Sequence, residues 1–159
     1  MNDPSPAQRD DGLVGASPPA QPRPRSQRRR VLVAEDDDAM RALVVETVRR
    51  QGHTVLDAND APALRAATMG PDIEAVWDLI VSDIRLPSGD GLLVLEALRR
   101  AGCGAPMIVM TAFGDEATRR RVEGLGGVLL EKPFPLEELT TAIDHLLFGT
   151  ARRQQVGPP

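Results

Sequence analysis

The sequence predicts an α/β fold in which helices cover both faces of a doubly wound, five-stranded parallel sheet. Five short apolar runs alternate with five helical patterns between residues 31 and 148. Most of the runs are apolar at every position, as expected of strands that are covered on both faces. Because strands separated by helices do not pair as hairpins, we expect a parallel sheet with right-handed crossovers.

The first two strands are expected to differ in exposure. The run at 31–34 is wholly apolar, whereas the run at 53–58 contains polar residues and is expected at an exposed position. The helix between them ends at Gly52, which is typical of a helix C-terminus. Its buried face is predicted to consist of Met40, Leu43, Val44 and Val48. A second helix is predicted at 61–69.

The remaining strands are predicted at residues 79–82, 107–110 and 128–130. Helices follow them at residues 91–100, 115–123 and 135–148. Asp90 is placed to cap the first of these helices, because a short acidic side chain accepts hydrogen bonds from the first turn. The last helix has the clearest apolar face, formed by Leu136, Leu139, Ile143, Leu146 and Leu147.

Composition narrows the class of protein. The chain has 159 residues, of which 42% are hydrophobic, which suffices for one folded domain. A single cysteine, Cys103, cannot form an internal disulfide, and no window approaches the roughly 18–20 apolar residues of a membrane span. We therefore expect a cytoplasmic protein that does not contact the membrane. Residues 1–29 are rich in Pro and Arg and are expected to be disordered.

Polar side chains follow four of the five predicted strands, at the point where each strand ends. They are Glu35 and Asp36 after the first strand, Asp83 after the third, Thr111 after the fourth and Lys132 after the fifth. Ligands of doubly wound sheets bind outside the carboxyl ends of the strands, so we expect these groups to converge on one small volume. Lys132 is also the only lysine of the chain.

The acidic groups after the first strand have two interpretations. Asp37 and Asp38 precede a helix and are better explained as helix caps. Glu35 and Asp36 lie on the strand end itself, and three crowded carboxylates need a cation to offset their repulsion. Mg²⁺ fits these carboxylate oxygens, because it takes oxygen ligands and commonly uses one or two carboxylates plus a phosphate oxygen.

A metal, an ammonium and a hydroxyl around a carboxylate describe a phosphoryl-transfer site. The metal and Lys132 would offset charge on the phosphate oxygens, and Thr111 would donate a hydrogen bond. Asp83 would then attack phosphorus as the nucleophile. No single element of this group is specific, and the inference rests on all of them occurring in this order.

Four segments of the chain resemble the two-component response-regulator receiver domain. They are VLVAEDDDAMR at 31–41, DLIVSDIRLPSGDGL at 78–92, IVMTAFGD at 108–115 and EKPF at 131–134. The resemblance implies a fold like that of the chemotaxis regulators, with the flavodoxin-like strand order 2-1-3-4-5. It places the receiver domain at residues 30–148, between the disordered tail at 1–29 and a flexible tail at 149–159.

The resemblance also implies a role for each residue of the site. Asp83 would be the phosphoacceptor. The metal ligands would be Glu35, Asp36, Asp83 and the backbone carbonyl of Arg85. Thr111 and Lys132 would bind the phosphoryl group, and the peptide bond between Lys132 and Pro133 would be cis.

Three features depart from the family pattern. Glu35 stands where an aspartate is commoner, which still supplies a hard oxygen donor. Leu129 stands where the family has its switch aromatic residue, so the switch surface, which includes Leu129 and Phe113, lacks its usual readout. The arginines at 119–121 are expected to repel one another and to make the surface of residues 112–131 easy to open.

The expected function is a signalling switch that accepts a phosphoryl group from a histidine kinase or phosphotransfer protein. Its output would be protein–protein binding to an unidentified target, with a phosphorylation-dependent dimer as one form. Arg85 and Phe113 flank the expected approach of hydrolytic water, and neither would position it, so we expect a long-lived phosphoryl state.

Three alternatives to this function stay open. The first is a detached receiver of a longer DNA-binding transcriptional regulator, the second is an aspartyl-phosphate phosphatase, and the third is a flavin-binding module. The phosphatase needs a second acid where Arg85 stands. The flavin module needs a phosphate loop where the sequence has EDDD at 35–38. Binding of nucleic acid by this chain is not expected.

Overall fold

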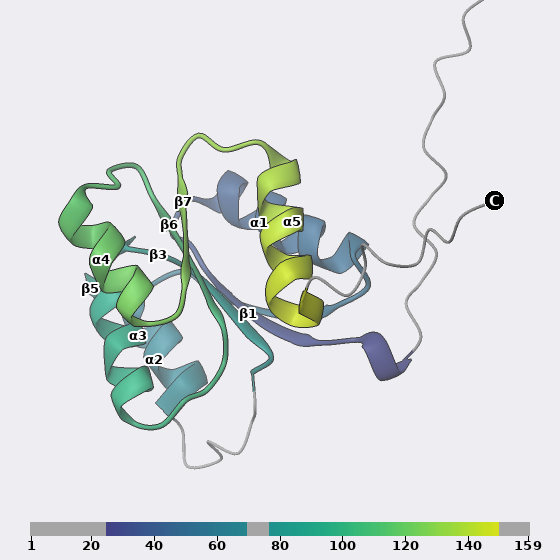
Figure 1. The fold of residues 1–159 in the computed structure, drawn as a ribbon, viewed down its shortest axis with the longest axis horizontal. Helices are drawn as coiled ribbons and strands as arrows, with labels where there is room; N and C mark the ends of the chain where they lie inside the picture. Colours follow the sequence, from purple (N-terminus) through teal and green to yellow (C-terminus); the bar gives the residue numbers. More distant parts are fainter. Residues whose placement is uncertain (1–24, 70–76, 150–159) are drawn as a thin grey trace, which may run out of the picture.

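The computed structural model describes residues 25–69 and 77–149, and its centre is a five-stranded parallel sheet (Figure 1). The strands are β1 (Arg30–Ala34), β2 (Thr54–Ala58), β3 (Leu79–Asp83), β6 (Met107–Thr111) and β7 (Val128–Glu131). Their order is β2-β1-β3-β6-β7, and every neighbouring pair is parallel. The predicted doubly wound sheet and its 2-1-3-4-5 strand order are therefore confirmed.

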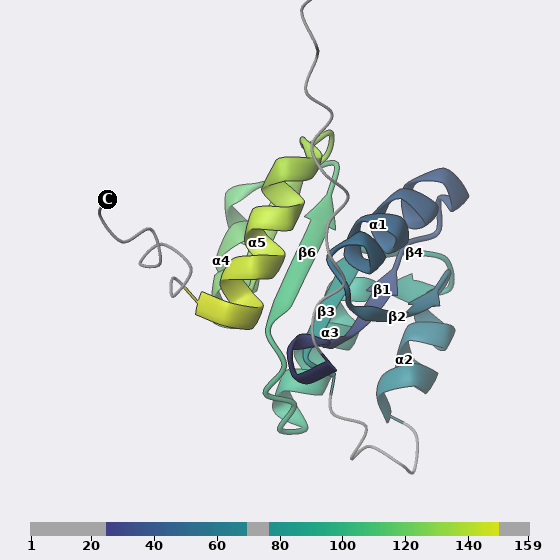
Figure 2. The ribbon, with the colours of Figure 1, turned by 90° about the vertical axis from the view of Figure 1, so that its right-hand side faces the viewer.

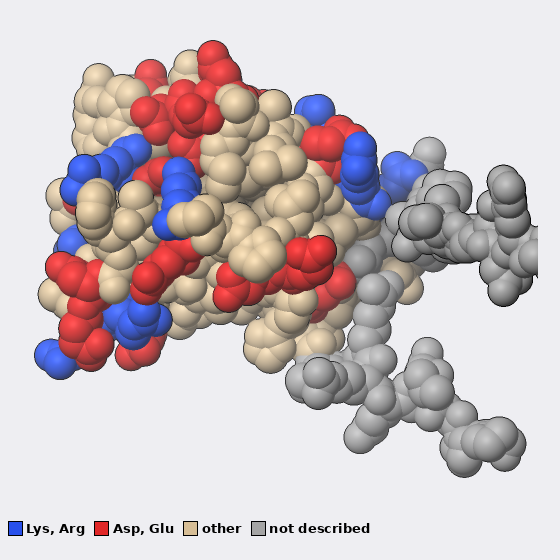
Figure 3. Space-filling model, turned by 90° about the horizontal axis from the view of Figure 1, so that it is seen from above, with Lys and Arg blue, Asp and Glu red and all other residues tan. Residues whose placement is uncertain are grey.

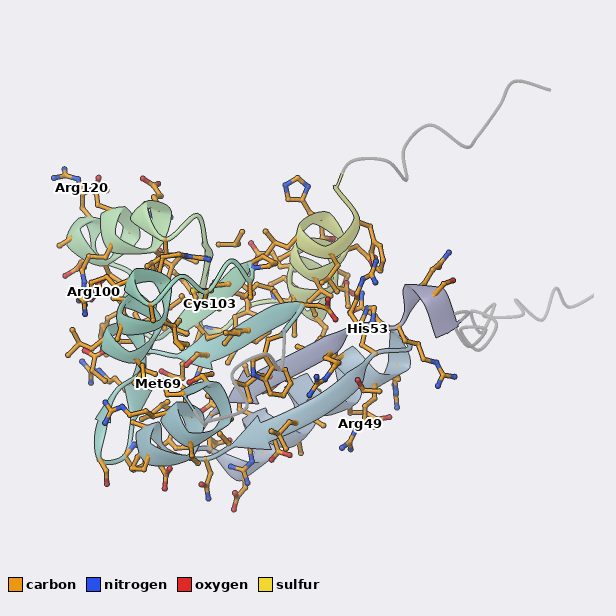
Figure 4. All side chains as sticks on the ribbon, turned by 90° about the horizontal axis from the view of Figure 1, so that it is seen from below. Arg49, His53, Met69, Arg100, Cys103 and Arg120 are labelled. Atoms are coloured by element: carbon orange, nitrogen blue, oxygen red, sulfur yellow. The ribbon has the colours of Figure 1, made fainter. Side chains whose placement is uncertain are left out.

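Helices cover both faces of the sheet. They are α1 (Asp38–Arg50), α2 (Ala61–Met69), α3 (Gly91–Arg100), α4 (Glu116–Gly124) and α5 (Leu136–Phe148). The helices α1 and α5 lie on one face, and α2, α3 and α4 lie on the other (Figures 1 and 2). Figure 4 looks onto the end of the molecule where Arg49, Met69 and Arg100 mark the C-terminal ends of α1, α2 and α3.

Alternation along the strands divides the core into two layers. Successive side chains of a strand point to opposite faces, so Leu32 and Ile80 pack on the side of α2 and α3, and Val33 and Val81 pack on the side of α1 and α5. All four side chains are fully buried. The strand β2 lies at the edge of the sheet and is largely exposed, as its sequence predicts.

Aspartates begin four of the helices. Asp37 accepts a hydrogen bond from the backbone N–H of Met40 (2.7 Å), which caps α1. Asp60, Asp90 and Asp115 cap α2, α3 and α4 in the same way. The caps predicted at Asp37 and Asp90 are therefore present, and each fixes where a helix begins relative to the strand end that precedes it.

Two helix faces differ from the prediction at one position each. In α1, Val45 joins Val44 and Val48 in the core, and Leu43 is 44% exposed. The buried stripe is thus rotated by one residue relative to the prediction. In α5, Leu136 lies in the first turn and is exposed, while Leu139 and Ile143 are fully buried.

A short antiparallel hairpin follows β3 and has no counterpart in the prediction. It consists of β4 (Arg85–Leu86) and β5 (Gly89–Asp90), joined through Ser88 at a φ of 63°. A positive φ is uncommon for a residue with a side chain, and it marks a tight turn. The hairpin carries the chain from the end of β3 to α3 immediately beside Asp83.

The described chain begins with a 3-10 helix, Arg25–Gln27, within the segment that the sequence predicts to be a disordered tail. Arg29 donates its backbone N–H to Nδ1 of His53 (3.3 Å), and its guanidinium lies 5.6 Å from the centre of the Phe148 ring. Arg29, the residue before β1, thus contacts the domain, whereas residues 26–28 are exposed. The rest of the predicted tails, residues 1–24 and 150–159, lies outside the described residues. Within the part of the chain that the structure covers, no helix has the length and apolarity to cross a membrane.

Candidate phosphoryl-acceptor site

Side chains from three strand ends meet above the sheet. Glu35 follows β1, Asp83 ends β3, and Lys132 follows β7. The Lys132 ammonium donates a hydrogen bond to Oε2 of Glu35 (2.7 Å) and a second one to Oδ2 of Asp83. One cation therefore bridges two carboxylates that are almost completely buried. The peptide bond between Lys132 and Pro133 is cis.

A third carboxylate, that of Asp36, completes an acidic group with Glu35 and Asp83. Ligand oxygens of the three residues all lie within 4.8 Å of one another. Glu35 and Asp83 are buried, and Asp36 is exposed, so the group is open to solvent on one side. Figure 3 looks down on this end of the molecule, where acidic side chains form several separate groups. The donor set of carboxylate oxygens fits a hard divalent cation such as Mg²⁺.

The backbone around Asp83 fixes the direction of its carboxylate. Oδ1 accepts a hydrogen bond from the backbone N–H of Arg85 (2.7 Å), two residues further on. Gly91 packs against the same segment, because a Cβ atom there would lie 2.1 Å from the carbonyl oxygen of Asp83. The N–H of Gly91 donates to the carbonyl of Ile84 (2.7 Å). Only glycine at position 91 allows α3 to approach β3 this closely.

Burial and charge shift two ionisable groups of the site. Burial raises the pKa of Glu35, against the lowering effect of its hydrogen bonds from Lys132 and the Asp37 backbone, and the negative charge of Asp83 adds to the rise. Burial by itself lowers the pKa of Lys132. Hydrogen bonds to Asp83 and Glu35 outweigh this effect, and the pKa of Lys132 is raised. The ammonium is thus charged and fixed between its two partners.

Thr111 ends β6, the strand between β3 and β7, but its hydroxyl forms hydrogen bonds with its own loop. Oγ1 accepts a hydrogen bond from the Phe113 N–H (3.0 Å) and donates one to the Phe113 carbonyl (3.2 Å). The Phe113 ring is 69% exposed, and the Arg85 guanidinium lies 5.1 Å from its centre. A cation–π contact therefore connects the segment after β3 with the loop after β6.

The predicted repulsion within the arginine run of α4 is wrong, because each arginine has its own acidic partner. Arg119 pairs with Glu131 of β7 (2.5 Å), Arg120 with Glu116 of the same helix (3.1 Å), and Arg121 with Glu96 of α3 (2.8 Å). The three side chains leave the helix in different directions. Leu129, the residue in place of the aromatic, is partly buried against the core beneath α2 and α3.

Comparison with known proteins decides the family. A family profile described as "Response regulator receiver domain" matches residues 31–144, well over half of the chain. The chain belongs to the response-regulator receiver family. Receiver domains are generally signalling domains of two-component systems rather than enzymes, and they interact with kinases or phosphotransfer proteins.

The curated relatives of this receiver domain are longer proteins. The transcriptional regulatory protein TcrA of Mycobacterium tuberculosis is 39% identical over 113 residues, which is 69% of this chain and 42% of TcrA. The sensor kinase CckA of Brucella abortus is 30% identical over 74% of this chain and 12% of the kinase. The chain thus spans less than half the length of these two relatives.

Solved structures share the fold. The receiver domain of HemR from Leptospira biflexa superposes with a TM-score of 0.68 at 24% identity, covering 83% of this chain and 98% of that domain. The chemotaxis response regulator CheY4 of Vibrio cholerae superposes with a TM-score of 0.66, also at 24% identity, over 76% of this chain and 99% of CheY4. At this level of identity the likeness concerns the fold alone.

The structure brings together Glu35, Asp36, Asp83 and Lys132, and it places Thr111, Phe113 and Leu129 on the neighbouring strands and loop. Two further residues of the site are not predicted from the sequence. Gly91 supports Asp83, as described above. Arg41 contacts the acidic loop after β1. The second glycine of the GDGL segment is a usable sequence signal for Gly91. Arg41 ends the VLVAEDDDAMR segment that resembles the family, but the sequence does not show that its side chain reaches back to the acidic loop.

Proposed function

We propose that this receiver domain is a phosphorylation-dependent switch that accepts a phosphoryl group on Asp83. The observation that carries the proposal is the buried carboxylate of Asp83 held between the Lys132 ammonium and the Arg85 backbone N–H, with Glu35 and Asp36 beside it. The donor would be the phosphohistidine of a histidine kinase or a phosphotransfer protein. We also propose residues 30–148 as the functional unit.

In the proposed reaction, an Asp83 carboxylate oxygen forms a bond to phosphorus. The bond between phosphorus and the imidazole nitrogen of the donor breaks, and its electron pair stays on that nitrogen. Lys132 lies within hydrogen-bond distance of Asp83 and offsets negative charge on the incoming phosphoryl group. The Arg85 N–H holds the other carboxylate oxygen, so the nucleophile is oriented before the donor arrives.

A divalent cation fits beside the nucleophile. Glu35, Asp36 and Asp83 offer oxygen ligands, and we propose the Arg85 carbonyl as a fourth. Bound Mg²⁺ would neutralise phosphate oxygens and orient the phosphoryl group. Asp36 is the exposed member of the group, so it lies on the side from which solvent and a phosphodonor approach.

Thr111 provides the proposed connection between the phosphoryl group and the molecular surface. A phosphoryl group adds about −1.5 to −2 charges and three acceptor oxygens. The Thr111 hydroxyl would turn toward it and leave the Phe113 backbone, which would shift the surface of residues 112–131, including Phe113 and Leu129. A protein partner, or a second copy of the chain, would then bind the shifted surface.

Labelling of Asp83 tests this function. We expect the full chain to acquire an acid-labile label from acetyl phosphate in the presence of Mg²⁺, and Asp83→Asn to lose it completely. Asp144→Asn, which removes a carboxylate from the second half of α5, is the matched control and should label like the wild type. Labelling of Asp83→Asn at the wild-type level would contradict the proposal.

The relatives raise one alternative about the context of the domain. TcrA is a transcriptional regulatory protein of which this chain spans 42%, so the chain also fits the receiver part of a longer transcriptional regulator. We favour a receiver that acts alone in the cytoplasm through protein–protein binding. Mapping the transcript and reading frame around the gene distinguishes the two, because a continuous downstream frame encoding a DNA-binding domain would contradict independent action.

A further inference from the structure

Arg41 contacts the acidic loop after β1 from the first turn of α1. Its Nη1 donates to the carbonyl of Glu35 (3.0 Å) and lies 3.5 Å from that of Asp36. Its Nη2 pairs with Asp38 (2.5 Å), and its Nε pairs with Asp57 of β2 (3.2 Å). Helical side chains lean toward the helix N-terminus, which explains how a residue of α1 reaches back to the strand end.

These contacts fix the loop to two other elements of the fold. The Arg41 side chain is only 18% exposed although it is charged, so it lies against the protein rather than in solvent. It connects the loop after β1 with both the beginning of α1 and the edge strand β2. A guanidinium has five N–H donors in a planar arrangement, and four separate acceptors lie within their reach here.

With the contact from Arg41, every polar group of Glu35 has a hydrogen-bond partner. Its N–H donates to the carbonyl of Ala58 (3.0 Å), and its own carbonyl accepts from Arg41. Its two carboxylate oxygens accept from the Asp37 N–H (3.1 Å) and from Lys132. The adjacent Asp36 has an exposed carboxylate, and the contact of Arg41 with its carbonyl is a restraint on the direction of its backbone.

We propose that Arg41 is a positioning residue for divalent cation binding, because its guanidinium holds the loop of Glu35 and Asp36 in the geometry that presents their carboxylates together. This inference rests on the proposed function, in which those carboxylates bind Mg²⁺. Arg41 itself would not touch the cation, and its effect would pass through the backbone of the loop.

Charge and geometry predict opposite effects of removing Arg41. The positive charge of Arg41 repels a divalent cation, so if charge alone mattered, its removal would tighten Mg²⁺ binding. If the guanidinium positions the loop, its removal weakens binding, since outer partners of metal ligands commonly account for 10–100-fold in affinity. The Arg41→Lys variant separates the two effects, because lysine keeps the charge but its three donors cannot replace the contacts of the guanidinium with four acceptors.

The test compares Mg²⁺ affinity of the full-length chain by isothermal titration calorimetry. The variants are Arg41→Met, Arg41→Lys and the control Arg50→Met, which removes an exposed arginine of the same helix that pairs with Glu46. We expect both Arg41 variants to bind Mg²⁺ about tenfold more weakly and Arg50→Met to stay within about twofold of the wild type. The rise in melting temperature on adding Mg²⁺ should shrink in parallel.

Each other outcome has a defined meaning. Arg41→Met binding as tightly as Arg50→Met, or more tightly, overturns the positioning role, and so does full wild-type affinity in Arg41→Lys. A lower melting temperature with unchanged Mg²⁺ affinity also overturns it, because the role would then be purely structural. If the wild type itself binds no Mg²⁺, the metal site fails together with the inference. If the wild type binds Mg²⁺ and the Arg41 variants bind it with the same affinity, the inference alone fails and the metal site stands.

Discussion

The two sides of Asp83 are constructed differently. On the side of β1 and α1, Glu35 is buried and its backbone and carboxylate are all hydrogen-bonded, to Lys132, Arg41 and neighbouring backbone groups. On the side of β6 and α4, the Thr111 hydroxyl bonds to its own loop and Phe113 is exposed. The first side is fixed by the contacts of a buried carboxylate. On the second side Thr111 is buried too, but its hydroxyl bonds only to its own loop, and the neighbouring ion pairs and Phe113 lie at the surface.

This difference indicates which half of the site can move. Opening the β1 side would separate buried charges from their partners, which costs several kcal/mol. Rearranging the β6 side requires exchange of two hydrogen bonds of Thr111 and of exposed ion pairs, each worth about 0.2–1 kcal/mol. The proposed function, with a cation bound on one side and a signal transmitted on the other, needs this asymmetry.

The largest expected effect is the loss of the Lys132 ammonium, which follows β7 and pairs with Glu35 on the fixed side. We expect Lys132→Met to lower the free energy of unfolding by about 3 kcal/mol in EDTA, because Glu35 and Asp83 would be left as buried like charges. Urea unfolding followed by circular dichroism measures this change.

The double variant Lys132→Met, Glu35→Gln is the control for that prediction. It removes the second charge of the pair, and we expect it to recover more than half of the lost stability, since one buried carboxylate no longer repels the other. A Lys132→Met loss below about 1 kcal/mol, or a double variant no more stable than the single one, would contradict a site held together by this ammonium.

The fixed side is also the more predictable from sequence. Continuous apolar runs fix the strands, and the ends of parallel strands share one edge, so the sequence alone places Glu35, Asp83 and Lys132 together. The cap at Asp37 follows from its position between a strand and a helical pattern. Each of these inferences uses local pattern and a general rule of sheet topology.

Long-range side-chain contacts could not be predicted in this way. The expected repulsion among the arginines at 119–121 is wrong chiefly because the partners of Arg119 and Arg121 lie 12 and 25 residues away in the chain. The partner of Arg120 is only four residues away, at a spacing that a helical pattern could have indicated. The β4–β5 hairpin is not predicted because its strands have two residues each, too short for any alternation. The exposure of Leu43 depends on how α1 is rotated against the sheet, which its apolar pattern fixes only to within one residue.

A smaller effect is expected at the boundary between the two sides. The Phe113 ring and the Arg85 guanidinium stack beside the site, and neither orients a water molecule for attack on phosphorus. We expect Phe113→Ser to shorten the lifetime of phosphorylated Asp83 about fivefold, equivalent to about 1 kcal/mol of activation free energy. Loss of the acid-labile label over time measures it, and Leu56→Ser, an exposed apolar residue on β2, is the control. An unchanged lifetime would leave the stacked pair without a role in dephosphorylation.

The smallest expected effect concerns the surface side, where Glu131 connects β7 to α4. Its side chain lies directly over Gly114, where a Cβ atom would come within 2.5 Å of Oε1, and its carboxylate pairs with Arg119. Movement of the loop after Thr111 must disturb this arrangement. We therefore expect Arg119→Gln to favour the rearranged surface and to tighten binding of beryllofluoride, a phosphoryl mimic, about two- to threefold.

Arg120→Gln provides the matched comparison, because it removes the same charge from the same helix. Arg120 pairs with Glu116 within α4, so the pair moves with the helix as a unit and contributes nothing to its attachment to β7. We expect its affinity for beryllofluoride to equal that of the wild type. Equal affinities in the two arginine variants would mean that net charge, rather than the connection between β7 and α4, sets the balance of the surface, and the proposed contrast between a fixed and a movable side would lose its main support.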